Sequence, residues 1–140
     1  MTRFAGGPGE SPGFLLWHVT LRWQRAIAEA LAPFQLTHVQ FVLLACTWWL
    51  NEQGQTPNQQ EVAAQAGTDV KMTSEVLRRL ESRGLITRRS ASADARAKSL
   101  TVTEPGLSLV RQAIDVVEQA DADFLGAHGA ELAKVLAHLT

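Results

Sequence analysis

The segment Arg78–Gly106, RRLESRGLITRRSASADARAKSLTVTEPG, decides how the chain folds. It begins with the end of a helical pattern, which stops at Gly84. Two short strand-prone runs follow, Leu85–Ser90 and Lys98–Val102, with the small residues ASADARA between them. Strand-prone runs separated in this way predict a β-hairpin, here with a loop longer than a tight turn.

The residues before this hairpin predict a helix-turn-helix. The segment TPNQQEVAAQAG predicts a short helix that either Asn58 or Thr56 caps and that Gly67 closes. After a turn of three residues, a second helix is expected from about Lys71 to Arg83. Its inward face is expected to consist of Met72, Val76, Leu77 and Leu80. Two such helices form a helix-turn-helix, and a hairpin directly after the second helix is a wing.

Further helical patterns flank this unit. Phe14–Leu31 and Thr37–Gln53 each predict a helix, and Thr103 is expected to cap a long one that precedes a last helix at about Ala130–Leu139. The first helix is apolar over more than one stripe, so it must bury more than one side. The expected fold class is mainly α with a small β wing (α+β). It comprises a winged helix-turn-helix over about residues 36–102, dimerisation helices over about 14–32 and 104–139, and a loose extension over 1–13.

The positive charge of the chain is concentrated in its middle. The 140 residues carry a formal net charge of −1, yet the stretch Lys71–Lys98 contains eight basic and three acidic residues. From Glu104 to the last residue there are six acidic residues and two basic ones. Segregated charge of this kind indicates where an anionic partner binds. We therefore expect double-stranded DNA to bind at the helix-turn-helix and wing.

The second helix of the motif carries the expected base contacts. Lys71, Thr73, Ser74 and Arg78 are expected to face the major groove, where such side chains form hydrogen bonds with base edges. Arg78 and Arg79 are alternatively phosphate contacts. The exposed positions of this helix are expected to be Lys71, Thr73, Ser74, Glu75, Arg78 and Arg79.

The remaining expected DNA contacts are on the preceding helix and on the wing. The helix start at Asn58 and Gln59 presents backbone N–H groups and a positive dipole end to a phosphate. Arg96 is expected to reach the minor groove from the wing tip, with Asp94 orienting it. The strands supply three further phosphate partners, Arg88, Arg89 and Lys98.

Several motifs, in order, resemble the MarR family of bacterial winged helix-turn-helix regulators. They are Leu36-Thr37 with Gln40-Phe41, Gln59-Gln60-Glu61-Val62-Ala63, Leu80-Glu81 with Gly84-Leu85-Ile86 and Arg88, Asp94-Ala95-Arg96, and Val102-Thr103-Glu104-Pro105-Gly106. The resemblance covers about residues 14–139. One departure is Ala95, since many members carry arginine between the wing aspartate and arginine.

The resemblance implies a homodimer in which the first helix and the last two helices interlock. It also implies a cytoplasmic bacterial repressor, nucleoid-associated when bound to a pseudo-palindromic operator. Members of the family commonly release DNA when a small aromatic or phenolic effector binds. The residues suited to such an effector are Trp17, His18, Arg22, Trp23, His38 and Trp48.

Other functions have less support in the sequence. No nucleophile motif, phosphate-binding glycine loop or paired carboxylate indicates an enzyme, and no cofactor is expected. The histidines lack the spacing of a metal site, and no apolar run is long enough for a membrane span. Cys46 lies among apolar residues without a basic neighbour, which favours a structural thiol over a redox sensor. Two alternatives remain: a winged-helix module that binds protein, and a redox-responsive regulator that uses Cys46.

Overall fold

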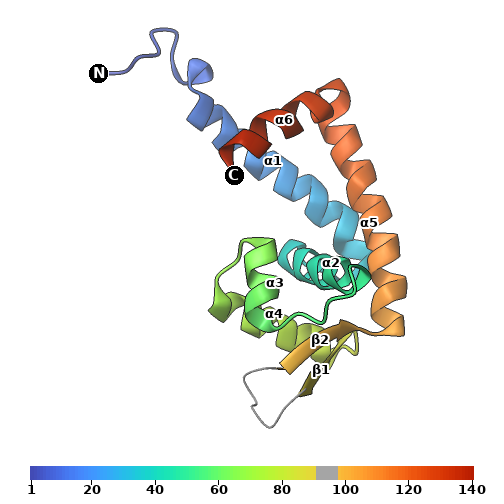
Figure 1. Ribbon diagram of the computed structural model, residues 1–140. Helices are drawn as coiled ribbons and strands as arrows, with labels where there is room; N and C mark the ends of the chain where they lie inside the picture. Colours follow the sequence, from blue (N-terminus) through green and yellow to red (C-terminus); the bar gives the residue numbers. More distant parts are fainter. Residues whose placement is uncertain (91–97) are drawn as a thin grey trace. The chain divides into compact units, whose positions relative to one another are not determined.

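The computed structural model describes residues 1–90 and 98–140, and helices make up most of it (Figure 1). The helices are α1 (Pro12–Leu31), α2 (His38–Glu52), α3 (Gln59–Ala66), α4 (Val70–Ser82), α5 (Glu104–Leu125) and α6 (Gly129–Leu139). Strands β1 (Ile86–Ser90) and β2 (Lys98–Val102) form a two-stranded antiparallel sheet. The predicted fold class, mainly helical with a small β wing, is confirmed.

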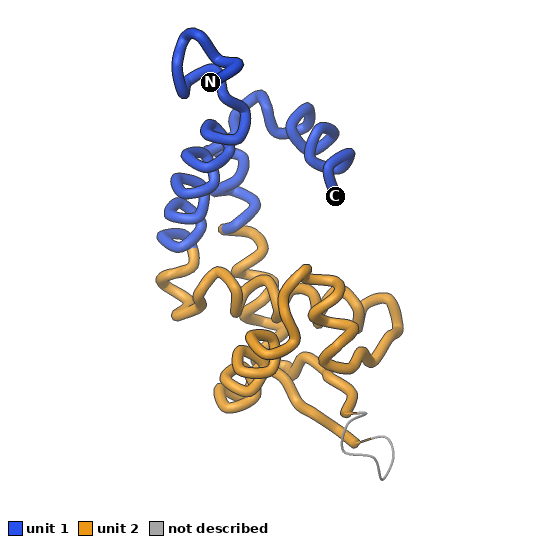
Figure 2. The backbone as a smooth tube through the Cα atoms, turned by 90° about the vertical axis from the view of Figure 1, so that its left-hand side faces the viewer, with its two compact units in different colours: residues 1–30, 117–140 blue, residues 31–116 orange. Residues whose placement is uncertain are grey.

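The chain divides into two compact units (Figure 2). One consists of residues 1–30 and 117–140, and the other of residues 31–116. The second unit contains the predicted helix-turn-helix and the described part of the predicted wing.

Helix α2 is central to the core of the 31–116 unit, where it contacts α3, α4 and β2. Leu43, Leu44 and Thr47 of α2 are fully buried. Thr47 is accommodated because its hydroxyl donates to the carbonyl oxygen of Leu43 at 2.8 Å. The helix starts with a capping box, in which Thr37 and Gln40 each bind the other's backbone N–H. Thr37 therefore caps this core helix.

The turn between α3 and α4 is built from caps. Asn58, not Thr56, caps α3, through a capping box with Glu61. Gly67 ends α3 in the left-handed conformation, with φ of 72°, which glycine adopts without the steric cost of a side chain. Asp69 then accepts a hydrogen bond from the backbone N–H of Met72 at 2.8 Å. Because Asp69 is the cap, α4 begins at Val70, slightly earlier than the sequence pattern suggested.

Strand β2 is held to the rest of its unit by hydrogen bonds from outside the sheet. The backbone N–H of Leu100 donates to the carbonyl oxygen of Pro57 at 2.8 Å. The Asn51 side chain donates to the carbonyl oxygen of Leu100 at 3.1 Å and accepts from the N–H of Val102 at 2.9 Å. The Asn51 side chain of α2 and the carbonyl group of Pro57 therefore hold the strand to the rest of its unit.

In the other unit, α1 is joined to the C-terminal part of α5 by a polar contact. The indole Nε1 of Trp23 donates to a carboxylate oxygen of Asp121 at 2.7 Å. A groove of about 390 Å³ next to this pair has an otherwise mainly apolar lining, formed by Leu16, Val19, Thr20, Phe124, Leu125, Leu132 and Leu136. Among the described residues, no single helix is both long and apolar enough to cross a membrane.

Candidate nucleic-acid interface

One face of α4 is buried and the opposite face is exposed. Val76, Leu77 and Leu80 are buried, as expected. Lys71 and Arg78 are exposed, as a surface that contacts DNA requires. The exposed side also includes Arg79 and Glu75, and Ser74 is half-buried at its margin.

Two residues of α4 lie on the opposite side from the one expected. Thr73 was expected in the groove but is fully buried, and Met72 was expected in the core but is 36% exposed. Buried residues 73, 76, 77 and 80 follow the helical spacing i, i+3, i+4 and i+7, so Thr73 belongs to the inward stripe. Met72 and Thr73 both lie at helical spacing from Val76, and the expectation was wrong because it placed the apolar residue of the two inside.

The buried hydroxyl of Thr73 has both of its hydrogen-bonding capacities satisfied. It donates to the carbonyl oxygen of Asp69 at 2.7 Å. Its oxygen lies 2.6 Å from the hydroxyl of Thr68, which therefore acts as the donor to it. Thr73 thus joins the turn before α4 to the first turn of that helix and has a structural role.

Arg88 on the wing also differs from its expected role as a phosphate contact. It pairs with the buried Leu100 across the strands, and paired residues share one face of the sheet. Its side chain is 17% exposed, and its Nε lies 3.7 Å from a carboxylate oxygen of Glu81. The Nε and Nη2 atoms are buried without a hydrogen-bond partner. Arg88 therefore lies mostly within the fold, and the exposed cations of the described strands are Arg89 and Lys98.

The start of α3 is engaged in local contacts. The Asn58 side chain accepts from the N–H of Glu61 at 2.9 Å, and the N–H of Asn58 donates back to Glu61 at 3.2 Å. Gln59 donates from its side chain to the carbonyl oxygen of Val70 at 3.4 Å, which links α3 to α4. Both side chains expected near a phosphate therefore also position the helix-turn-helix.

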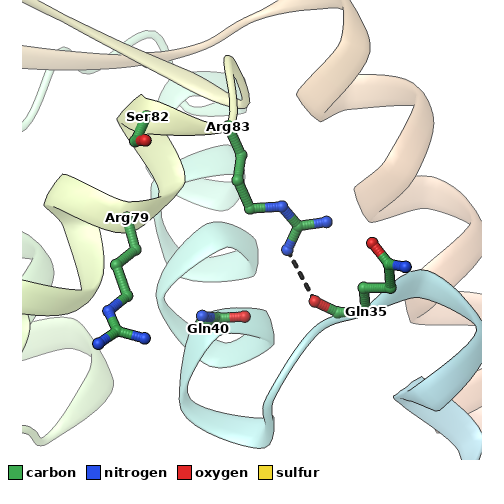
Figure 3. Close-up of a pocket in the computed structure, with 5 residues that line it drawn as sticks. All are labelled: Gln35, Gln40, Arg79, Ser82 and Arg83. Atoms are coloured by element: carbon green, nitrogen blue, oxygen red, sulfur yellow. Dashed lines mark hydrogen bonds between the residues drawn. The ribbon is translucent and has the colours of Figure 1, made fainter.

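A contact that the sequence did not suggest lies at the C-terminal end of α4 (Figure 3). Arg83 donates to the carbonyl oxygens of Gln35 and Phe34, at 2.8 and 3.2 Å. Gln35 has a positive φ of 55°, which is uncommon for a residue with a side chain. Arg79 lies beside Gln40 on the other side of an open cavity of about 470 Å³. No local sequence signal marks Arg83, because its partners are backbone atoms nearly fifty positions away.

The six residues expected to contact an effector fall in both units. In the unit of residues 1–30 and 117–140, Trp17, His18 and Arg22 are exposed and Trp23 is half-buried. His18 packs edge-on against Phe14, with ring centroids 4.5 Å apart. In the 31–116 unit, His38 and Trp48 are half-buried, and the indole Nε1 of Trp48 is buried without a hydrogen-bond partner.

The structure gives less support to the redox alternative. Burial raises the pKa of the Cys46 thiol, which disfavours the reactive thiolate form.

Among the described residues, no group of three histidine, cysteine or acidic side chains is arranged to hold a metal ion. The wing-tip residues Asp94, Ala95 and Arg96 lie outside the described residues.

Together, the capped helix-turn-helix, the exposed cations of α4 and the adjoining hairpin define a winged helix-turn-helix DNA-binding protein. The MarR family profile matches residues 36–98. The chain is 45% identical over 121 residues to the helix-turn-helix transcriptional regulator YdcH of Bacillus subtilis. This alignment covers 86% of this chain and 82% of YdcH. The chain therefore belongs to the MarR family of transcriptional regulators, as the sequence motifs predicted.

Solved structures agree with this assignment. CouR from Rhodococcus jostii RHA1 bound to p-coumaroyl-CoA matches with a TM-score of 0.81 and 29% identity, over 95% of this chain and 92% of CouR. CouR bound to a 23-mer DNA duplex matches with a TM-score of 0.81 and 27% identity, over 99% and 98% of the two chains. The chain described here is a DNA-binding transcriptional regulator.

Proposed function

We propose that the chain is a homodimeric repressor that binds a pseudo-palindromic operator and releases it when a small aromatic molecule binds. The exposed face of α4 enters the major groove of each half-site. The observation that carries this proposal is the arrangement of α4, with one fully packed face and with Lys71, Arg78 and Arg79 exposed on the other. Arg89 and Lys98 add phosphate contacts from the wing, and the start of α3 adds backbone N–H groups. Catalysis has no part in this function, which is exercised in the cytoplasm and at the nucleoid.

The exposed apolar side chains of α1 and α6 support the dimer. On α1 they are Phe14, Leu15, Leu16, Trp17, Val19 and Leu21, and on α6 they are Val135, Leu136 and Leu139. A soluble monomer rarely exposes so large a set of neighbouring apolar residues, and a second copy would remove them from water. A symmetric dimer requires two half-sites about one helical turn of DNA apart.

Operator binding is tested with the DNA upstream of the protein's own gene, by fluorescence anisotropy over a range of salt concentrations. Three to five phosphate contacts per subunit give a slope of log K against log salt of about −5 to −9 for the dimer. Arg78→Ala should weaken binding at least tenfold, whereas Arg111→Ala, which removes an exposed arginine of α5, should not. A flat salt dependence would overturn the proposal, and a stable dimer without DNA binding would favour the protein-interaction module.

The effector part of the proposal is supported by CouR, whose structures contain either DNA or p-coumaroyl-CoA. In this chain Trp48 has a buried indole N–H without an acceptor, which a ligand oxygen would satisfy. Tryptophans supply the flat apolar surface on which an aromatic ring stacks.

The effector is tested by adding p-coumaric acid, salicylic acid and p-coumaroyl-CoA to the protein–operator complex. We expect at least one of the three to release the DNA. Trp48→Phe keeps an aromatic ring but loses the N–H, so it should weaken the effector response while operator affinity stays unchanged. Trp49→Phe, at the exposed neighbouring position, is the matched control. Failure of all three compounds at millimolar concentration would overturn release by an aromatic acid or its thioester.

A further inference from the structure

Glu75 is an acidic residue on the otherwise basic exposed face of α4. It lies in the middle of the helix, with Lys71 four positions before it and Arg78 and Arg79 three and four positions after it. Side chains at these spacings are neighbours on a helix and often form ion pairs. Within the described residues Glu75 forms no such pair, whereas Glu81, the other acidic residue of α4, lies near Arg88. The carboxylate of Glu75 is therefore exposed and available to a partner.

A carboxylate on a DNA-binding face is repelled by phosphates, so it is favourable only where it meets a hydrogen-bond donor. In the major groove the amino groups of cytosine and adenine are the donors. Adenine presents the acceptor N7 beside its amino group, and guanine and thymine present acceptors O6, N7 and O4. An ionised carboxylate only accepts hydrogen bonds, so cytosine N4 is the base group that suits it best.

The residues around Glu75 divide α4 into two parts. Met72, in its first turn, is 36% exposed and uncharged, and it lies three positions before Glu75, on the same side of the helix. Arg78 and Arg79 lie in the second half. The N-terminal half of a recognition helix usually makes the base contacts, and apolar side chains there pack against thymine methyl groups. Glu75 therefore lies between a first turn that carries the exposed Met72 and the exposed cation Lys71 and a second half that carries two exposed arginines.

We propose that Glu75 determines operator specificity by accepting a hydrogen bond from a cytosine N4 amino group in each half-site, next to a position where Met72 favours thymine. This proposal rests on the proposed DNA-binding function and adds the identity of a contacted base. It assigns sequence preference mainly to Glu75 and Met72, and it takes Arg78 and Arg79 in their alternative role as phosphate contacts.

The test compares base preferences of the wild type, Glu75→Gln and Glu75→Ala on a pool of duplexes randomised at one half-site. The wild type should enrich a C·G pair at one position of the half-site. Replacing that pair by T·A in a fixed operator should weaken wild-type binding by roughly 5- to 100-fold. In Glu75→Ala this discrimination should fall below about threefold. Glu75→Gln should shift the preference towards adenine, because glutamine both donates and accepts.

The control is Glu52→Gln, which removes an exposed acidic residue of α2 and should leave the preference for cytosine intact. If Glu75 were only a solvated charge, both Glu75 variants would bind every sequence more tightly and keep the wild-type preferences. That result, or a wild type without an enriched cytosine, would overturn this inference and leave the proposed function standing. A wild type that binds no duplex would overturn the proposed function, and this inference with it.

Discussion

The guanidinium of Arg83 donates to the carbonyl oxygen of Gln35 at 2.8 Å, and so ties the end of α4 to the loop that precedes α2. A second bond, to the carbonyl oxygen of Phe34, strengthens the tie. The helix that we propose to enter DNA is thus held near both ends. Asp69 and Thr73 hold its beginning, and Arg83, the residue directly after its end, is held by these two hydrogen bonds.

Removing the Arg83 tie should lower stability more than removing a neighbouring arginine. We expect Arg83→Ala to lose about 1 kcal/mol of unfolding free energy, because its hydrogen bonds are to solvent-exposed carbonyl groups. Arg83→Lys keeps a single donor group, so its unfolding free energy should lie between those of Arg83→Ala and the wild type. Urea denaturation measures the change. Arg78→Ala should unfold like the wild type while losing operator affinity, and the opposite ranking would show that Arg83 contributes nothing to the fold.

Thr73→Val should affect folding and leave base preference unchanged. The substitution keeps the shape of the side chain but removes the hydroxyl that is hydrogen-bonded to Asp69 and Thr68. We therefore expect the unfolding free energy to fall by about 1–2 kcal/mol. Thr101→Val, at an exposed position of β2, should change stability by less than about 0.5 kcal/mol. Altered base preference in a Thr73→Val protein that is otherwise as stable as the wild type would restore Thr73 to the DNA contacts.

Gly106→Ala should be among the more harmful substitutions. A Cβ at this position would clash with the carbonyl oxygen of Leu85, a backbone atom that cannot move aside cheaply. We expect a loss of about 1–3 kcal/mol, measured by thermal or urea unfolding. Gly9→Ala provides the comparison, because a Cβ there meets nothing within 4 Å. Equal stability of the two variants would mean that the start of α5 packs less closely than the structure shows.

Cys46 should be unreactive in the folded protein at neutral pH. Burial raises its pKa, so the folded chain holds the thiol proton more tightly than the unfolded chain does. Any stability from this shift is present at neutral pH and is lost as the pH rises past the ordinary thiol value of 9.0. Iodoacetamide should therefore label Cys46 rapidly only in denaturant, and peroxide should leave operator binding unchanged. Peroxide-induced release that Cys46→Ala abolishes would establish the redox-responsive alternative.

The arrangement of helices and strands could be predicted because its signals are local. Glycines and capping residues mark the ends of the helices, and the hydrophobic period identifies Val76, Leu77 and Leu80 as buried residues of α4. The exchange of Met72 and Thr73 was missed because a buried threonine depends on two partners, Asp69 and Thr68, that only the folded turn brings together.

Long-range contacts to the backbone could not be predicted at all. Arg83 and Asn51 each bind backbone groups roughly fifty residues away, and nothing in their own neighbourhoods distinguishes them from other polar residues. Arg88 could not be placed for a related reason. Successive residues of a strand point to opposite faces of the sheet, so one of two adjacent arginines faces inward, and the sequence does not show which. Half of the pair Arg88–Arg89 is therefore exposed.

The hydrogen bonds that Asn51 and Pro57 make with β2 have a consequence for self-association. A two-stranded sheet presents unpaired backbone groups along its outer sides, and such groups recruit strands from other chains. Here the N–H and carbonyl of Leu100 and the N–H of Val102 are already occupied. A loop carbonyl group and one amide side chain thus occupy part of the outer side of β2. These contacts reduce the tendency of β2 to pair with strands of other chains.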